Sequence, residues 1–259
     1  MDFNILTYIL VKESKIVYEY LYIFEIDFRV IDYSLIKKTL LTFSLIGFTF
    51  LILGLTSMNL FIVSAYGAII VGTDDEDRIK GTKQKDSIFG LGDSDKIWGR
   101  DKGDYLDGGS GKDRIEGNSG KDNIFGDSGS DKIEGNSGND YIDGYNGDDL
   151  IQGNSGDDEI LGYDGDDIIQ GNKGEDAIYG EDDDDRIEGN AGDDWINGGN
   201  NRDLLIGGSG DDILWGKSGK DVLIGGPGGD EFHCGKGFDI IIDYNKFEGD
   251  TKSKNCEVF

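Results

Sequence analysis

Between Gly72 and His233 the chain repeats one pattern of polar and apolar positions every nine residues. The first position of each unit is Gly, the sixth is Asp, and the eighth is Ile or Leu until Phe232 closes the series. Eighteen units follow one another without insertion or deletion. Six residues rich in Gly followed by x-Ile-x predict a turn and then a very short strand, in which the Ile points to one side and its neighbours to the other.

One inward Ile per unit cannot bury itself, so the units must stack with each Ile over its equivalent. Alternate units differ in composition, which gives a second period of eighteen residues. This longer period is expected if two strands make one coil. The Asp of each turn lies beside Gly-rich backbone, and carboxylate and carbonyl oxygens are the hard ligands that Ca²⁺ prefers. The pattern therefore predicts an all-β stack of coils whose turns carry rows of oxygen ligands.

The segment Gly108–Glu116 fits the motif G-G-x-G-x-D-x-U-x at every position. Over residues 72–242 the sequence closely resembles the RTX, or haemolysin-type, calcium-binding repeat family. The resemblance implies a parallel β-roll, a β-solenoid with two strands per coil and about 18–19 nonapeptide repeats. It also implies that each calcium ion lies between loops two units apart, bound by backbone carbonyls and sixth-position Asp side chains. The metal ligands expected in this way are Asp77, Asp86, Asp95, Asp104, Asp113, Asp122, Asp131, Asp140, Asp149, Asp158, Asp167, Asp176, Asp185, Asp194, Asp203, Asp212, Asp221, Asp230 and Asp239.

Some units depart from the motif at the fourth position. Gly is replaced there by Asp75, Gln84, Asp93, Lys102, Asp183 and Asn201. If this position requires positive φ, Asp and Asn tolerate it better than Gln or Lys. Because the first four units all depart, we expect weak or absent sites there and an N-terminal cap, with the surest sites between Gly108 and Asp230. Eighteen loops leave up to 16 gaps between loops, and we expect about ten tightly held calcium ions.

The outward positions of odd and even units differ in chemistry. Odd units carry basic residues at position seven (Arg78, Lys96, Arg114, Lys132, Arg186) and acidic ones at position nine (Glu116, Glu134, Glu188), which predicts charge ladders on one sheet face. Even units carry Phe89, Tyr105, Phe125, Tyr141, Tyr179, Trp195 and Trp215 at these positions, and Asn118, Asn136, Asn154, Asn172 and Asn190 in what we expect to be loops. The aromatic residues either support strand formation alone or form a face that binds a glycan, surface-layer or protein partner. The candidate partner face comprises Tyr105, Tyr141, Tyr179, Trp195 and Trp215.

Composition excludes several classes of function. With 53 acidic and 25 basic residues the net charge is −28, which opposes collapse unless cations neutralise it and argues against nucleic acid as a partner. A disordered acidic tail or a halophile-like surface would lack the regular spacing. His233 is the only His, so zinc sites and His-based triads are poorly supported. An ice-binding roll is disfavoured, because the third positions contain no array of Thr.

The N-terminal part predicts export. No charged residue occurs from Thr39 to Thr73, Lys37 and Lys38 come just before, and Val63-Ser64-Ala65 resembles a signal-peptide cleavage site. Residues 39–63 are also long enough for an uncleaved membrane anchor. Either way the rest of the chain is expected to be secreted or on the extracellular cell surface. The expected division is 1–36, an extension of unknown role; 37–65, signal peptide or anchor; 66–242, calcium-binding β-roll; and 243–259, C-terminal cap.

A nineteenth unit, Cys234–Ile242, has Cys in place of the first Gly. Cys234 and Cys256 are the only cysteines, and in an exported chain they predict a disulfide, with two inert thiols as the alternative. Outside the repeats there is no room for a catalytic domain, and neither a metalloprotease His motif nor a G-x-S-x-G elbow is present. We therefore expect a non-enzymatic, exported calcium-binding protein with a structural or adhesive role. The alternative is a non-catalytic RTX module, or the remnant of a secreted hydrolase or toxin.

Overall fold

In a computed structural model of the chain, the structure describes residues 7–8, 60–64 and 67–258. These residues form strands and turns, and none of them lies in a helix. Accordingly, within the described part of the chain there is no apolar helix of a length that would cross a membrane. Apart from residues 7–8 and 60–64, the N-terminal extension and the predicted signal peptide or anchor lie outside the described residues.

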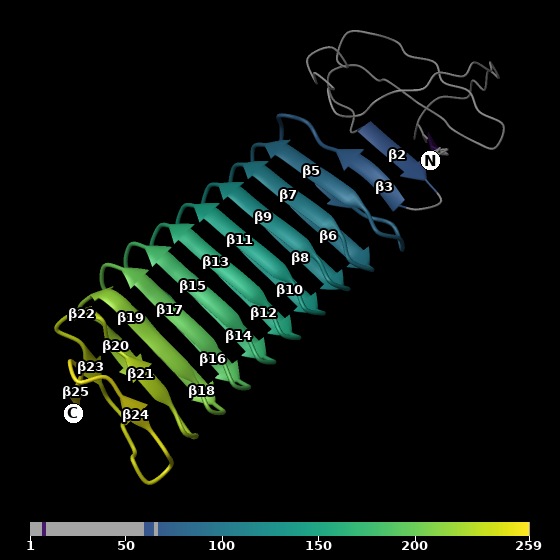
Figure 1. The fold of residues 1–259 in the computed structure, drawn as a ribbon. Helices are drawn as coiled ribbons and strands as arrows, with labels where there is room; N and C mark the ends of the chain where they lie inside the picture. The colour runs from purple at the N-terminus through teal and green to yellow at the C-terminus, as the bar shows by residue number, and fades with distance from the viewer. Residues whose placement is uncertain (1–6, 9–59, 65–66, 259) are drawn as a thin grey trace, which may run out of the picture.

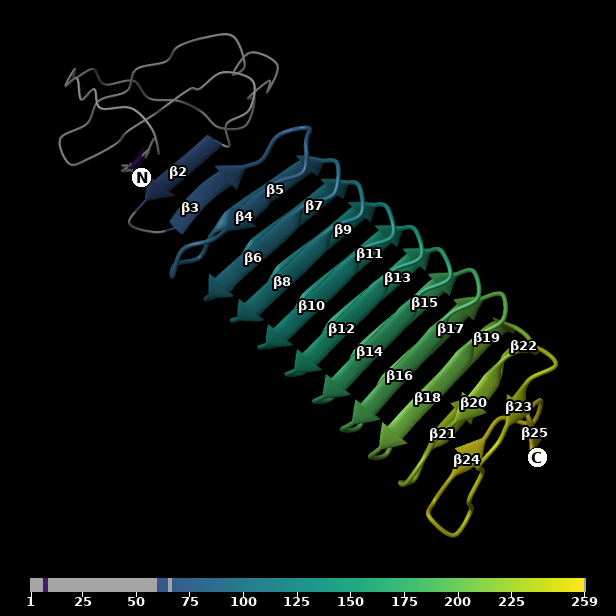
Figure 2. The ribbon, with the colours of Figure 1, turned by 180° about the vertical axis from the view of Figure 1, so that it is seen from behind.

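The strands form two sheets that face each other along one axis (Figures 1 and 2). Sheet A contains β1 (Thr7–Tyr8), β2 (Leu60–Ser64), β3 (Gly67–Val71), β5 (Ser87–Gly92), β7 (Tyr105–Ser110), β9 (Asn123–Ser128), β11 (Tyr141–Asn146), β13 (Glu159–Asp164), β15 (Ala177–Asp182), β17 (Trp195–Asn200), β19 (Ile213–Gly219), β21 (Glu231–His233), β22 (Lys236–Gly237) and β24 (Thr251–Lys252). Sheet B contains β4 (Arg78–Lys80), β6 (Lys96–Asp101), β8 (Arg114–Ser119), β10 (Lys132–Ser137), β12 (Leu150–Ser155), β14 (Ile168–Lys173), β16 (Arg186–Ala191), β18 (Leu204–Ser209), β20 (Val222–Ile224), β23 (Ile240–Ile241) and β25 (Glu257–Val258).

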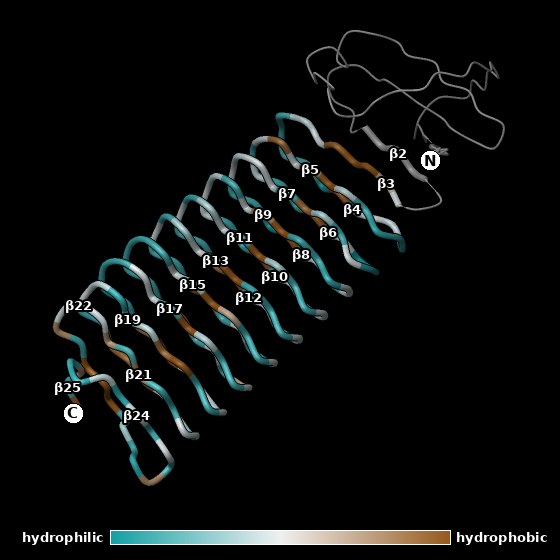
Figure 3. The backbone as a smooth tube through the Cα atoms, viewed as in Figure 1, coloured by the Kyte–Doolittle hydropathy of each residue, from teal (hydrophilic) through white to brown (hydrophobic). Residues whose placement is uncertain are grey.

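The chain alternates between the two sheets, so consecutive units make one coil. In sheet B, Ile133 of β10 lies between Ile115 of β8 and Ile151 of β12, in parallel register and eighteen residues from each. The eighth-position side chains are at most 2% exposed and form one apolar core between the sheets. Figure 3 shows this core as a hydrophobic band across the strands, with hydrophilic turns at both edges. The predicted all-β parallel roll with two strands per coil is confirmed.

The prediction of very short strands was wrong. A full strand has six residues, positions seven to nine of one unit and one to three of the next, as in β8. The alternation continues through the Gly, because position one points inward and is buried while position two points outward. Consequently the recurrent Asn residues at position two are not in loops: Asn118 and Asn136 pair in register on the outer face of sheet B.

Both ends of the roll extend beyond the visible period. β3 precedes the first unit, and its Ile70 pairs in register with Ile88 of β5. The sequence hid this half-coil because Ala68 stands where other units have Asp. At the other end β24 and β25 continue sheets A and B. Cys234 and Cys256 form a buried disulfide there, and their Cα atoms are 5.4 Å apart.

Candidate calcium-binding columns

The sixth-position Asp residues are stacked one per coil by backbone hydrogen bonds. The backbone N–H of Asp140 donates to Oδ1 of Asp158 at 2.7 Å, and that of Asp158 donates to Oδ1 of Asp176 at 2.8 Å. Equivalent bonds join residues eighteen apart from Ala68–Asp86 to Asp221–Asp239. The predicted ligands therefore form two columns, one from the even units and one from the odd units, at the entrance to the strands of sheets A and B.

The first-position Gly is required by the Asp of its own unit. A Cβ atom on Gly153 would lie 2.3 Å from Oδ2 of Asp158 and 3.0 Å from the carbonyl oxygen of Gly171 in the next coil. No side chain fits between these atoms, so the Gly and the Asp five residues later act as one structural pair. This contact explains why the two positions are invariant across the eighteen units.

The second carboxylate oxygen has no protein partner in most units. Oδ2 is buried without a hydrogen bond in every sixth-position Asp from Asp95 to Asp239. A buried polar atom left in this way costs roughly 1–3 kcal/mol, and more when it is charged. Each unit therefore holds an oxygen that requires a ligand other than the groups around it.

The first two units differ from the rest. At position two, the backbone N–H groups of Thr73 and Thr82 donate to Oδ2 of Asp77 and Asp86 at 2.6 and 2.5 Å. This contact occupies the oxygen that remains open elsewhere. In units three and four, Asp95 and Asp104 have the same open Oδ2 as the later units. Loss of Gly at position four therefore does not by itself change the Asp.

Burial makes these carboxylates hard to ionise. It raises the pKa of Asp158 to about 8 and that of Asp185 to about 9, with smaller contributions from neighbouring Asp residues and an opposing one from the backbone hydrogen bond. Asp122 and Asp212 reach about 7 for the same reasons. A free Asp has a pKa of about 3.9. Near neutral pH each column must therefore either hold protons or be neutralised by cations.

The residues fit calcium. Ca²⁺ takes six to eight oxygen ligands in flexible geometry. A cation between two coils meets one Asp carboxylate from each, and the Gly-rich turns place backbone carbonyls beside them. Among the described residues, no three His, Cys, Asp or Glu side chains are grouped so that they could hold a metal ion. The donor set of each gap is accordingly two carboxylates with backbone carbonyls or water.

Comparison with known families gives the same assignment. Overlapping segments match the RTX calcium-binding nonapeptide repeat (4 copies), at residues 71–106, 98–133, 125–163, 143–178, 161–196, 170–205, 179–214 and 206–241. The chain belongs to this family. A search of curated proteins found no significant match. The RTX repeat accounts for the Gly and Asp positions on which both columns depend.

One RTX column contains a residue that the sequence analysis missed. The backbone N–H of Asp230 donates to Oδ1 of Asp250 at 3.1 Å, and that of Asn245 donates to Oδ2 of Asp250 at 2.5 Å. Asp250 is therefore the next member of the even column, although it lies twenty residues after Asp230 instead of eighteen. The repeated dipeptides Gly229-Asp230 and Gly249-Asp250 were the available signal, and a two-residue insertion hid it.

The outer faces of the RTX roll have the predicted difference in charge. On sheet B, the Arg114 guanidinium lies 2.9 Å from Glu116 and 3.2 Å from Glu134, and Lys132 lies 2.8 Å from Glu134. Trp98 is an aromatic exception on this face, in register with Glu116. These ion pairs are half-exposed, so each contributes about 1 kcal/mol or less to stability.

The candidate partner face lies on sheet A, where Tyr105, Tyr141, Tyr179, Trp195 and Trp215 all occur. As predicted, Trp195 and Trp215 are on the neighbouring strands β17 and β19. The rings pack against one another along the roll, with centroids 4.9 Å apart for Tyr179 and Trp195. Sequence analysis missed the stacked pair Tyr145 and Tyr163 on the same face, because position two was assigned to loops.

Proposed function

We propose that the chain is an exported calcium-binding repeat protein whose β-roll folds when its two Asp columns bind calcium. The observation that carries the proposal is the buried, unpaired Oδ2 atom in every sixth-position Asp from Asp95 to Asp239. Calcium supplies the missing partner for these atoms and offsets part of the net charge of −28. Binding free energy then becomes folding free energy.

Two features support an extracellular place of action. The buried disulfide between Cys234 and Cys256 is typical of proteins that fold in an oxidising compartment. The uncharged stretch from Thr39 to Thr73 has the composition of an export signal or anchor. In that compartment a long, rigid roll serves a structural or adhesive role, with the aromatic face of sheet A as its contact surface. No catalytic domain is evident in the described residues, which form only the repeat roll and its ends.

Circular dichroism of residues 66–259 tests the calcium role. In chelator the spectrum should be that of a disordered chain, and millimolar calcium should convert it to a β-rich one. Magnesium at equal concentration is the control, because Mg²⁺ demands a tighter octahedral shell. A β-rich spectrum in chelator at neutral pH would contradict the proposal.

Cell fractionation tests the location. We expect the protein in the medium or at the cell surface, and we expect a calcium chelator to release the surface-attached fraction. A protein confined to the cytoplasm in both conditions would overturn the extracellular role and leave calcium binding to be judged by the spectra alone.

A further inference from the structure

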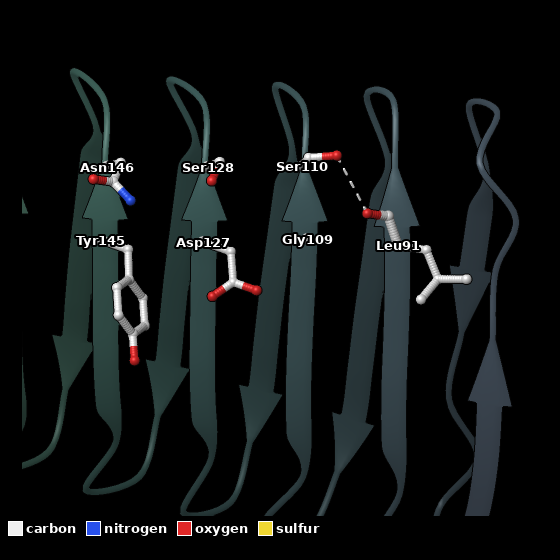
Figure 4. Close-up of a pocket in the computed structure, with 7 residues that line it drawn as sticks. All are labelled: Leu91, Gly109, Ser110, Asp127, Ser128, Tyr145 and Asn146. Carbon is white, nitrogen blue, oxygen red and sulfur yellow. Dashed lines mark hydrogen bonds between the residues drawn. The ribbon is translucent and has the colours of Figure 1, made fainter. Parts of the chain in front are cut away.

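A shallow hollow lies on the outer face of sheet A, where four adjacent strands present their position-two residues. These are Leu91 on β5, Gly109 on β7, Asp127 on β9 and Tyr145 on β11 (Figure 4). Gly109 has no side chain and leaves a gap between Leu91 and Asp127, and the hollow as a whole has a volume of about 310 Å³. The rim of the hollow is formed by Ser110, Ser128 and Asn146.

The gap at Gly109 is built into the backbone. Gly109 has φ +93°, and a Cβ atom there would lie 2.3 Å from the carbonyl oxygen of Leu91. Larger residues at position two elsewhere, such as Tyr145 and Tyr163, fill the equivalent space with their side chains. The hollow is therefore a defined break in the side-chain row of sheet A.

Asp127 is the acidic residue that lines the hollow. Asp107 lies on the neighbouring strand β7, and burial together with the charge of Asp127 raises the pKa of Asp107 to about 6. On the other side, Asp143 of β11 is only 2% exposed, and its Oδ1 has no hydrogen-bond partner. Asp127 and Asp143 are close enough for their charges to repel each other. Within the described part of the chain, none of the three forms an ion pair with Lys, Arg or His.

The walls beside these acids are apolar and aromatic. Leu91 is 40% exposed and Tyr145 is 39% exposed, which is unusual for large apolar groups in this roll. One face of the Tyr145 ring stacks on Tyr163, with ring centroids 5.4 Å apart. On its other side, Tyr145 is next to Asp127, which lies between Tyr145 and Gly109 (Figure 4). An alkyl chain that lies against Leu91 and crosses Gly109 would bring a terminal cation to Asp127 and to the Tyr145 ring beside it.

We propose that this hollow binds the lysine side chain of a partner protein, with the methylene stem over Gly109 against Leu91 and the ammonium group at Asp127, beside the Tyr145 ring. The bound cation would also relieve the repulsion among Asp107, Asp127 and Asp143. The inference builds on the proposed adhesive role, because it names the chemistry of the partner that sheet A contacts. The bound lysine would contact neither the Asp residues of the calcium columns nor the disulfide.

The test uses the full chain in millimolar calcium and follows the backbone amide signals of Gly109 and Ser110 by NMR. The probes are Nα-acetyl-lysine methylamide, its Nε-acetylated counterpart and glucosamine. We expect the lysine probe to shift both signals with a dissociation constant on the order of millimolar, since a single side chain buries little surface. The Nε-acetylated probe has the same stem without the charge and should bind at least about tenfold more weakly.

Variants locate the site. Asp127→Asn should weaken the lysine probe about tenfold, whereas Asp164→Asn, which removes the same charge from an exposed position on β13, should change it less than about twofold. Ser110→Lys places a lysine on the rim and should abolish binding by occupying the hollow. Equal effects of the two Asn variants, equal binding of both lysine probes, or tighter binding of glucosamine would each overturn the proposal. Calcium-induced folding is measured separately by circular dichroism, so the two proposals can fail independently.

Discussion

At the scale of single residues, the roll depends on the close approach of a carboxylate to a Gly, which has no side chain to block it. The Gly at position one leaves the space into which the Asp of the same unit turns, and the Asp then accepts a backbone hydrogen bond from the coil before it. One oxygen of each carboxylate is thereby fixed to the protein and the other is left for a ligand. The position of a column Asp, and not its charge alone, therefore determines what its substitution does.

Replacing Asp158 with Asn should reduce the calcium count by up to two ions, because its carboxylate faces one gap on each side. Asp157→Asn is the matched control, since it removes the same charge from the exposed neighbouring residue. Without calcium, Asp158→Asn should instead stabilise the roll by roughly 1–3 kcal/mol, because a buried carboxyl group is replaced by a neutral amide. Isothermal titration calorimetry counts the ions, and the pH at which the metal-free roll forms, followed by circular dichroism, measures the difference in stability. Equal ion losses in both variants would contradict the assignment of Asp158.

The raised pKa values predict that acid partly replaces calcium. The folded pKa values of about 6 for Asp176, 7 for Asp122 and 9 for Asp185 all exceed the unfolded value of about 3.9. The folded roll therefore binds more protons than the unfolded chain, and its calcium-free stability is fully present below about pH 4 and lost as pH rises through about 9. Circular dichroism of metal-free protein should show more β-structure at pH 4 than at pH 8. Equal spectra at the two pH values would contradict this prediction.

At the scale of strands and turns, the sequence predicts the stacking better than the strand itself. The Ile period, the two-unit coil and the face of Trp195 and Trp215 follow from spacing, because each depends on which residues recur. Strand length does not, because Gly at position one disfavours strands by propensity and is nevertheless held in the ladder by its neighbours in the stack. The same tertiary constraint explains why Asn118 lies in a strand at φ +78°. Asp250 escaped detection because a two-residue insertion breaks the period at the end of the stack.

One junction between turns is held differently from the others. Asp183 and Asn201, in neighbouring coils, have φ +79° and +73°, whereas the position-four glycines with positive φ have values of 125–153°. Their side chains join the two turns: Asn201 Nδ2 donates to Asp183 Oδ1 at 3.0 Å, and Asn200 Nδ2 donates to Asp182 Oδ1 at 2.6 Å. Arg202 forms an ion pair with Asp184 beside them. Two side-chain pairs and an ion pair therefore meet at this junction, whereas other turns are bridged by fewer side-chain contacts, such as the bond from the Asp166 N–H to Asp148 Oδ1.

This junction should therefore keep its order at calcium concentrations that loosen the rest of the roll. Hydrogen exchange during a calcium titration should show residues 180–206 protected at lower calcium than the flanking coils. Asn201→Ala should remove most of that advantage, roughly 0.5–1 kcal/mol for an exposed side-chain pair. Asn139→Ala, which removes the two contacts of Asn139 with Asp157 in a distant pair of turns, is the control and should leave the protection of residues 180–206 unchanged. Uniform protection along the whole roll would contradict the idea of a distinct junction.

At the scale of the whole molecule, charge and architecture must be satisfied together. The chain carries −28, and its two columns place carboxylates on every coil without basic partners inside the roll. The ion pairs on sheet B lie on the outer face and do not reach these carboxylates. The disulfide and the strands β24 and β25 close one end of the stack, and β3 begins the other. Between these ends, divalent cations are the natural source of the missing positive charge.

The structure sets an upper limit on how many ions the roll can hold. Open Oδ2 atoms in the odd column run from Asp95 to Asp239 and enclose eight gaps, and those in the even column run from Asp104 to Asp230 and enclose seven. Asp250 adds one more gap at the end of the even column, in which only Asp230 has an open Oδ2 because the Asn245 N–H donates to Oδ2 of Asp250. We therefore expect about ten tightly held ions and at most 16, with dissociation constants of about 10⁻⁴–10⁻³ M, as is typical of extracellular modules.

Elemental analysis and calorimetry on the calcium-saturated protein measure this number directly. Ten Ca²⁺ ions would carry about +20 and sixteen about +32, against the −28 of the chain, so calcium should strongly slow the migration of the protein towards the anode in native electrophoresis. Asp250→Asn should lower the count by at most one, because Asp250 borders a single gap and its Oδ2 already accepts from Asn245, whereas a substitution inside a column should remove up to two ions. Two or fewer bound ions per chain would rule out columns of calcium, whatever the family of the repeat.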